Sequence, residues 1–215
     1  MPDFPKELSH VYWIGGSPCA GKSTLARRLV NDFGFTYYKC DDCYEDHMSR
    51  STPAQHPAMY EIRDLTWNQV WSGKFCAIPV EQQILDVIKV YQEQFQLILE
   101  DLLSRPKTSN ILVEGAALMP ELIAPVLQNQ HQAIWFVPTA EFQIKHYSQR
   151  EWIHNILSQY NDPEAAFSNW MKRDIGFAKK VMEEAEQLGL PAVGVDGSLS
   201  IDQHYENLVE QFKLG

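Results

Sequence analysis

The chain has 215 residues, of which 45% are hydrophobic and 12% aromatic, and its formal net charge is −10. This length supports one sizeable core, and the acidic balance disfavours a broad binding surface for DNA, RNA or an anionic membrane. The first residues lack the basic-then-apolar pattern of a signal peptide, and no apolar run approaches the roughly 18 residues of a membrane span, so we expect a soluble cytoplasmic protein.

The first predicted elements are a strand, a glycine-rich loop and a helix. The apolar run 11–14 (VYWI) is typical of a buried parallel strand, and apolar residues recur at helical spacing from Leu25 to Phe33, where Gly34 ends the helix. The segment between them, GGSPCAGKST, contains the P-loop pattern, in which backbone amides wrap a phosphate, a lysine contacts its outer oxygens and a hydroxyl ligates Mg²⁺. We expect nine residues to bind the nucleotide: Gly16, Ser17, Pro18, Cys19, Ala20, Gly21, Lys22, Ser23 and Thr24.

The chain has four cysteines, at positions 19, 40, 43 and 76. We interpret them as reduced thiols, because a single Cys40-x-x-Cys43 pair with His47 nearby is a weak signal for a metal or redox site. Cys19 is a separate hypothesis: a thiol in a P-loop near a helix N-terminus could have a lowered pKa and block ATP when oxidised.

The second predicted strand, residues 35–40, ends at Asp41 and Asp42. Ligands of open α/β sheets bind beyond the carboxyl ends of the strands, so an aspartate here would share the rim of the sheet with the P-loop. Asp41 could accept a proton from an attacking hydroxyl or orient it. The spacing from Asp42 to Glu45 matches a capping box, so we assign Asp42 to capping the next helix.

The segments GGSPCAGKST and YYKCDD resemble the small P-loop kinases of the shikimate kinase, chloramphenicol phosphotransferase and nucleoside monophosphate kinase group; they also resemble kinase-like and phosphoglycerate-kinase-like ATPases of bacteria. The resemblance implies a three-layer α/β P-loop NTPase fold with a five-stranded parallel sheet, ATP and Mg²⁺ as cofactors, and phosphorylation of a small molecule. It places Asp41 at the position that contacts the acceptor hydroxyl. We expect a single domain over 1–215.

Residues 43–105 are predicted to be helical and depart from the shikimate kinase pattern. One apolar stripe steps by three and four through Ile84, Ile88, Tyr91, Phe95, Ile98 and Leu102, which indicates core packing in a helix that ends before Arg105. In the resembled group this segment covers the acceptor, which gives Arg63, with Tyr60, Trp67 and Trp71, a candidate substrate role beside the alternative of core packing.

The third predicted strand, residues 111–113, runs into Glu114 and has the form of a Walker B element with Glu in place of Asp. A carboxylate there can hold Mg²⁺, usually through water, or orient the acceptor. We leave both roles open for Glu114.

Two further strands, 133–137 and 192–195, complete the predicted sheet. The turn at Asp196 and Gly197 would lie beside the adenine by the resemblance, or only punctuate strand and helix. Residues 141–189 are predicted to form a helical lid, in which Arg150 and Arg173 would stabilise the transferring phosphate; the alternative for each is a surface ion pair.

The sequence therefore favours an ATP-dependent kinase with catalytic Lys22, Asp41, Arg150 and Arg173. The alternative is a nucleotide-binding regulator or slow ATPase that binds a protein partner and has no small-molecule acceptor. A kinase of polynucleotide 5′ ends is disfavoured by the acidic charge. The acceptor, the choice between ATP and GTP and the oligomeric state stay open.

Overall fold

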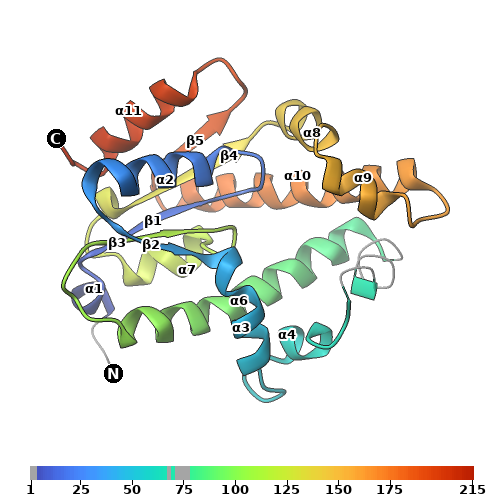
Figure 1. Ribbon diagram of the computed structural model, residues 1–215, viewed down its shortest axis with the longest axis horizontal. Helices are drawn as coiled ribbons and strands as arrows, with labels where there is room; N and C mark the ends of the chain where they lie inside the picture. Colours follow the sequence, from blue (N-terminus) through green and yellow to red (C-terminus); the bar gives the residue numbers. More distant parts are fainter. Residues whose placement is uncertain (1–3, 67–68, 71–77) are drawn as a thin grey trace.

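The computed structural model describes residues 4–66, 69–70 and 78–215. They form one parallel sheet with helices around it (Figure 1). Its strands are β1 (Val11–Gly16), β2 (Thr36–Lys39), β3 (Ile111–Glu114), β4 (Ala133–Pro138) and β5 (Ala192–Val195), in the order β2-β3-β1-β4-β5. All four pairings are parallel. Each of the five predicted strands is present, and the expected α/β fold with a five-stranded parallel sheet is confirmed.

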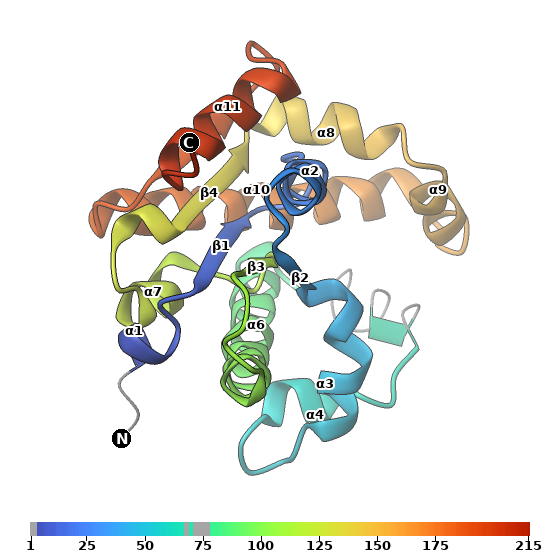
Figure 2. The ribbon, with the colours of Figure 1, turned by 60° about the vertical axis from the view of Figure 1, so that its left-hand side comes forward.

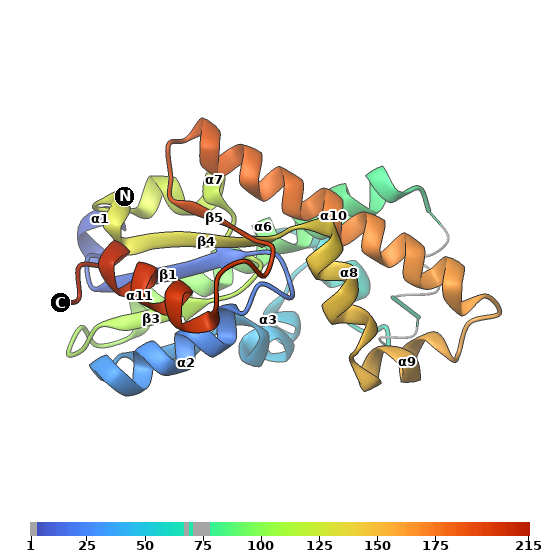
Figure 3. The ribbon, with the colours of Figure 1, turned by 90° about the horizontal axis from the view of Figure 1, so that it is seen from above.

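Helices cover both faces of the sheet (Figure 3). The α-helices are α1 (Phe4–Glu7), α2 (Lys22–Phe33), α3 (Tyr44–Arg50), α4 (Pro57–Ile62), α6 (Val80–Ser104), α7 (Pro120–Ile123), α8 (Ala140–Ser148), α9 (Glu151–Leu157), α10 (Pro163–Gln187) and α11 (Ile201–Gln211). Short 3-10 turns are η1 (Cys40–Cys43), η3 (Ala124–Val126) and η4 (Gln130–Gln132). Within the described ranges, no helix combines the length and the apolar character that crossing a membrane requires.

The two faces of the sheet follow from the two-residue period of its strands. Trp13 and Trp135 point to the face covered by α6, α7 and α10, where they are fully buried. Ile14 and Phe136 point to the opposite face, against α2 and α11. The three layers therefore result from strands that are apolar on both sides.

The α6 stripe packs as predicted. Ile88, Phe95, Ile98 and Leu102 are buried in the core, and Ile84 and Tyr91 pack against its edge.

A second group of helices lies beyond the carboxyl ends of the strands. In Figure 3, α8, α9 and one end of α10 extend past the sheet, and Figure 2 shows α3 and α4 beside α6. A separate cluster of buried residues, including Met59, Ile153 and Trp170, holds these helices together. The predicted helical stretch 141–189 is thus three helices, and it shares a small core with the segment after β2.

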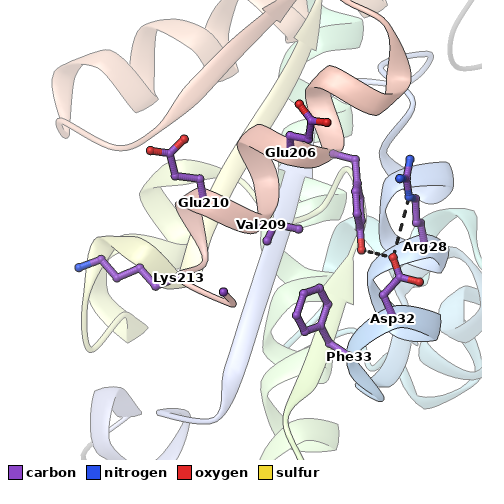
Figure 4. Close-up of a pocket in the computed structure, with 9 residues that line it drawn as sticks. Arg28, Asp32, Phe33, Glu206, Val209, Glu210 and Lys213 are labelled. Carbon is purple, nitrogen blue, oxygen red and sulfur yellow. Dashed lines mark hydrogen bonds and ion pairs between the residues drawn. The ribbon is translucent and has the colours of Figure 1, made fainter.

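Helices α2 and α11 contact each other on the face of the sheet opposite α6, α7 and α10. The Arg28 guanidinium lies 3.9 Å from the centre of the Tyr205 ring, and the Tyr205 hydroxyl donates to Asp32 at 2.5 Å. Figure 4 shows Arg28 and Asp32 beside α11, along a surface pocket of about 610 Å³. This pocket is lined by the second half of α2, whereas the P-loop precedes its first turn.

Candidate active site

The P-loop connects β1 to α2, in the predicted order of strand, loop and helix. Gly21 has a φ of 78° immediately before the first helical residue, Lys22, and Cys19 has a φ of 69°. Positive φ suits glycine but strains a cysteine, so the loop carries one unfavourable backbone conformation. Such strain is typical of sites where backbone groups must point in one set direction.

Lys22 is buried against the loop that it follows. Its ammonium donates to the Ser17 carbonyl oxygen at 2.7 Å, and the residue is only 7% exposed. Burial lowers the pKa of Lys22, and the charges of Glu114 and Asp41 oppose that shift. An added negative charge near the ammonium would therefore stabilise its protonated form.

Glu114 lies at the end of β3, 3% exposed, and accepts two hydrogen bonds on one oxygen. The Ser23 and Tyr37 hydroxyls each donate to Glu114 Oε2 at 3.0 Å. Burial and the Glu114 charge raise the pKa of Tyr37, so its phenol stays protonated as a donor. Tyr37 was not predicted from the sequence as a site residue. In the structure it is the register partner of Leu112, and Leu112 and Glu114 lie two residues apart on the same face of β3, which brings the Tyr37 hydroxyl to Glu114.

The two aspartates after β2 have different surroundings. Asp41 lines a cavity beside the P-loop, with its carboxylate 74% exposed and 4.0 Å from the Lys39 ammonium. The assignment of Asp42 as a helix cap is wrong: α3 begins only at Tyr44, its N-cap is Cys43 without a side-chain cap, and Asp42 pairs with Lys39 at 2.9 Å. The 3-10 turn η1 carries the chain past Asp42 before the α-helix starts.

The cavity has a volume of about 580 Å³ and reaches from Pro18 of the P-loop to the helices beyond the sheet. Arg150 and Arg173 both line it. Among the described residues, six aromatic side chains contribute to its walls: Tyr44, Tyr91, Tyr147, Trp152, Trp170 and Phe177. Several of these rings touch, with centroids 5.4 Å apart for Tyr91 and Phe177 and 5.8 Å apart for Trp152 and Trp170.

The two arginines have different surroundings. Arg150 is the N-cap of α9, and its guanidinium lies 5.1 Å from the centre of the Tyr147 ring. Arg173 forms a buried ion pair with its neighbour Asp174, with N–O distances of 2.8 and 2.6 Å, and the Trp170 indole donates to Asp174 at 3.1 Å. Asp174 was not singled out from the sequence, because an acid beside an arginine on a helix is usually a solvated pair.

Arg63 does not line this cavity. It lies in a neighbouring groove, where its guanidinium pairs with Asp64 at 3.1 Å and stacks over Tyr60 at 4.3 Å. Trp67 and Trp71, which the sequence gives the same candidate substrate role, lie outside the described residues.

The turn after β5 approaches the P-loop from the other side. Asp196 accepts hydrogen bonds from the Ser198 amide at 2.8 Å and from its hydroxyl at 2.6 Å. Gly197 has a φ of 89°, and a Cβ atom there would lie 3.2 Å from the Phe142 ring. The following helix reaches the loop directly, since Ile201 lies 3.4 Å from the position of a Cβ atom on Gly21.

The cysteine hypothesis needs one correction. Burial raises the pKa of Cys19 more than the charges of Arg150 and Lys22 lower it, so the thiol is not activated as proposed from its position in the loop. Cys40 is buried, and the described residues contain no group of three or more His, Cys, Asp or Glu side chains that could hold a metal ion.

Comparison with known proteins gives distant structural likenesses. A shikimate kinase from Acinetobacter baumannii in complex with shikimate is 13% identical, with 95% of this chain and 92% of that chain covered and a TM-score of 0.47. A deoxyadenosine kinase from M. mycoides is 13% identical with dATP bound (94% and 99% covered, TM-score 0.47) and with dCTP bound (95% and 99%, TM-score 0.44). No family model matches the chain, and no curated protein is similar to it in sequence. The strand order and the loop between β1 and α2 show a parallel α/β fold, in agreement with the three-layer fold expected from the sequence.

Proposed function

We propose that the protein is an ATP-dependent phosphotransferase that moves the terminal phosphate of ATP to a hydroxyl or phosphate group of a small molecule. One observation carries this proposal: a cavity of about 580 Å³ joins the P-loop, at Pro18, to Asp41 and Arg150. A site that only binds or slowly hydrolyses a nucleotide does not need an aromatic-walled space beyond the phosphate. The cavity has the place and the size for an acceptor.

The donor side is formed by the P-loop and its surroundings. The loop amides and Lys22 bind the phosphates, and Lys22 moves from the Ser17 carbonyl to the phosphate oxygens when the nucleotide enters. The turn at Asp196 and Gly197 is proposed to contact the adenine.

Mg²⁺ fits this donor side. The Ser23 hydroxyl and the Glu114 carboxylate are oxygen ligands 3.0 Å apart, and Mg²⁺ is commonly held by one or two protein oxygens together with nucleotide phosphates. The ion would neutralise charge on the phosphates, and Glu114 would bind it or orient the acceptor.

The acceptor side is formed by Asp41, which orients or deprotonates the attacking group. Arg150 and Arg173 stabilise charge on the transferring phosphate, with Arg173 held in place by Asp174. Arg63, in the adjoining groove, is proposed to contact parts of an acceptor that extend out of the cavity. The predicted single domain over 1–215, with its acceptor-side segment 43–105 and lid 141–189, belongs to this proposal.

The test is ATP consumption with Mg²⁺, alone and with pooled hydroxylated and phosphorylated metabolites, nucleosides, and aminoglycoside- or phenicol-type antibiotics. Asp41→Asn should abolish acceptor-dependent turnover while ATP binding persists. Asp42→Asn is the matched control, because the two carboxylates are adjacent and similarly exposed, at 74% and 71%. ATP binding with no acceptor-dependent turnover in any pool would favour the regulator, and equal loss in both variants would remove the role of Asp41.

A further inference from the structure

Gln143 of α8 is a fully buried amide that contacts the P-loop from outside. Its exposed fraction is 0%, and its Nε2 donates to the Ser17 hydroxyl oxygen and to the Pro18 carbonyl oxygen, both at 3.1 Å. Its Oε1 has no hydrogen-bond partner among the described residues. The amide is therefore held only by the two hydrogen bonds that its Nε2 donates, while its buried oxygen Oε1 is left without a donor.

Only a donor with two hydrogens satisfies these partners. The Ser17 hydroxyl passes its hydrogen toward the carbonyl oxygen of Asp174, at 3.5 Å, so it is an acceptor toward Gln143. Pro18 offers a carbonyl oxygen, which can only accept. A carboxylate at position 143 would place negative charge against both oxygens, and a leucine would leave both without this donor.

The bond to Pro18 fixes the direction of one particular peptide. The peptide between Pro18 and Cys19 is planar and trans, so its carbonyl and the Cys19 amide point in opposite directions. By holding the carbonyl toward α8, Gln143 turns the Cys19 amide away from α8. It does so at a residue whose φ of 69° is unfavourable for cysteine.

Lys22 cannot perform this task. It binds the Ser17 carbonyl oxygen, and the amide partner of that carbonyl belongs to Pro18, which has no N–H. Lys22 must also leave that carbonyl if it is to reach a phosphate. Gln143 is the contact that can stay in place when a nucleotide binds.

We infer that Gln143 is a positioning residue for phosphate binding, which holds the Pro18–Cys19 peptide so that the Cys19 amide is available to a bound phosphate. The inference rests on the proposed function, since it assumes a nucleotide in the P-loop. It also connects the loop to α8, which precedes Arg150 in the chain, and, through Ser17, to α10.

The experiment measures the dissociation constants of ATP, ADP and adenosine by isothermal titration for wild type, Gln143→Leu, Gln143→Glu and Gln132→Leu. Gln132 is the matched control, because it is also a buried amide, 3% exposed, whose Nε2 donates to backbone carbonyls, those of Ser9 and Val11 at 3.0 Å, at the opposite end of the sheet. Urea unfolding of each variant reports the loss of stability separately.

We expect Gln143→Leu to weaken ATP and ADP binding by about tenfold or more, Gln143→Glu to weaken it further, and adenosine binding to stay unchanged. Gln132→Leu should lose stability and keep wild-type affinity for ATP. The inference is overturned if Gln143→Leu binds ATP as wild type does, if adenosine binding falls equally, or if Gln132→Leu loses ATP affinity to the same degree. A wild-type protein that binds no ATP would instead refute nucleotide binding itself.

Discussion

Replacing Gly16 with alanine tests how closely β1 and β4 approach where the P-loop begins. Gly16 has a φ of 120°, and an added Cβ atom would lie 2.0 Å from the Phe136 carbonyl oxygen and 2.8 and 2.9 Å from two other backbone atoms of Phe136. Phe136 is the register partner of Gly16 in β4. Relief of the clash therefore requires two paired strands to move apart.

Gly34→Ala is the matched control for this variant. Gly34 also has a positive φ, 71°, but a Cβ atom there would meet nothing within 4 Å. Both alanines incur backbone strain, about 1–3 kcal/mol at each position, and both rigidify the unfolded chain to the same extent. Only Gly16→Ala adds overpacking, typically about 1–3 kcal/mol.

We therefore expect Gly16→Ala to lower the free energy of unfolding by about 2 kcal/mol more than Gly34→Ala does. Urea unfolding followed by far-UV circular dichroism measures both values, and an unchanged m-value would show that the two denatured states are comparable. Equal losses in the two variants would refute the close approach of β4 to Gly16.

Three further variants test other parts of the structure. Burial alone would raise the pKa of Asp101, but hydrogen bonds from three side chains lower it below its usual value. The folded protein therefore keeps this carboxylate ionised at pH values where the unfolded chain binds a proton. Its contribution to stability is fully present above about pH 4 and is lost as the pH falls through the lowered pKa. The difference in unfolding free energy between wild type and Asp101→Asn should thus shrink below about pH 4, and a constant difference would contradict this. Ile98→Ala should lower the unfolding free energy by about 2–5 kcal/mol, since Ile98 is 0% exposed, and a loss under about 1 kcal/mol in thermal or urea unfolding would argue against its place in the core. Tyr205→Phe removes the hydrogen bond to Asp32 and should lower the free energy of unfolding, measured in urea, by about 1 kcal/mol. ATP affinity should stay at the wild-type value, because the contact lies away from the P-loop, and reduced ATP binding would contradict this.

The sequence predicted those parts of the fold whose signals are local. Short stretches of consecutive residues were enough to predict the strand at 11–14, the loop that follows it and the end of α2 at Gly34. In each case the residue types are typical of one local structure. The end of β3 at Glu114 was recognisable for the same reason. These elements place the phosphate side of the candidate site.

The remaining contacts depend on distant parts of the chain. Gln143 meets Ser17 across 126 positions, and nothing in the residues around it distinguishes it from a surface glutamine of a helix. The capping role predicted for Asp42 failed because Lys39, three residues earlier, pairs with it and η1 delays the start of α3. Local spacing carries no information about such competition, so it can be resolved only in the folded chain.

The aromatic walls of the cavity also provide an optical reporter. Trp152 is 47% exposed and touches Trp170, which is 4% exposed, whereas Trp13 and Trp135 are fully enclosed in the sheet core. A molecule that enters the cavity displaces water from the exposed indole and leaves the core indoles unchanged. Among the tryptophans that the structure describes, Trp152 is thus the one whose fluorescence emission should shift to the blue on filling, which allows candidate acceptors to be screened without a label and without turnover.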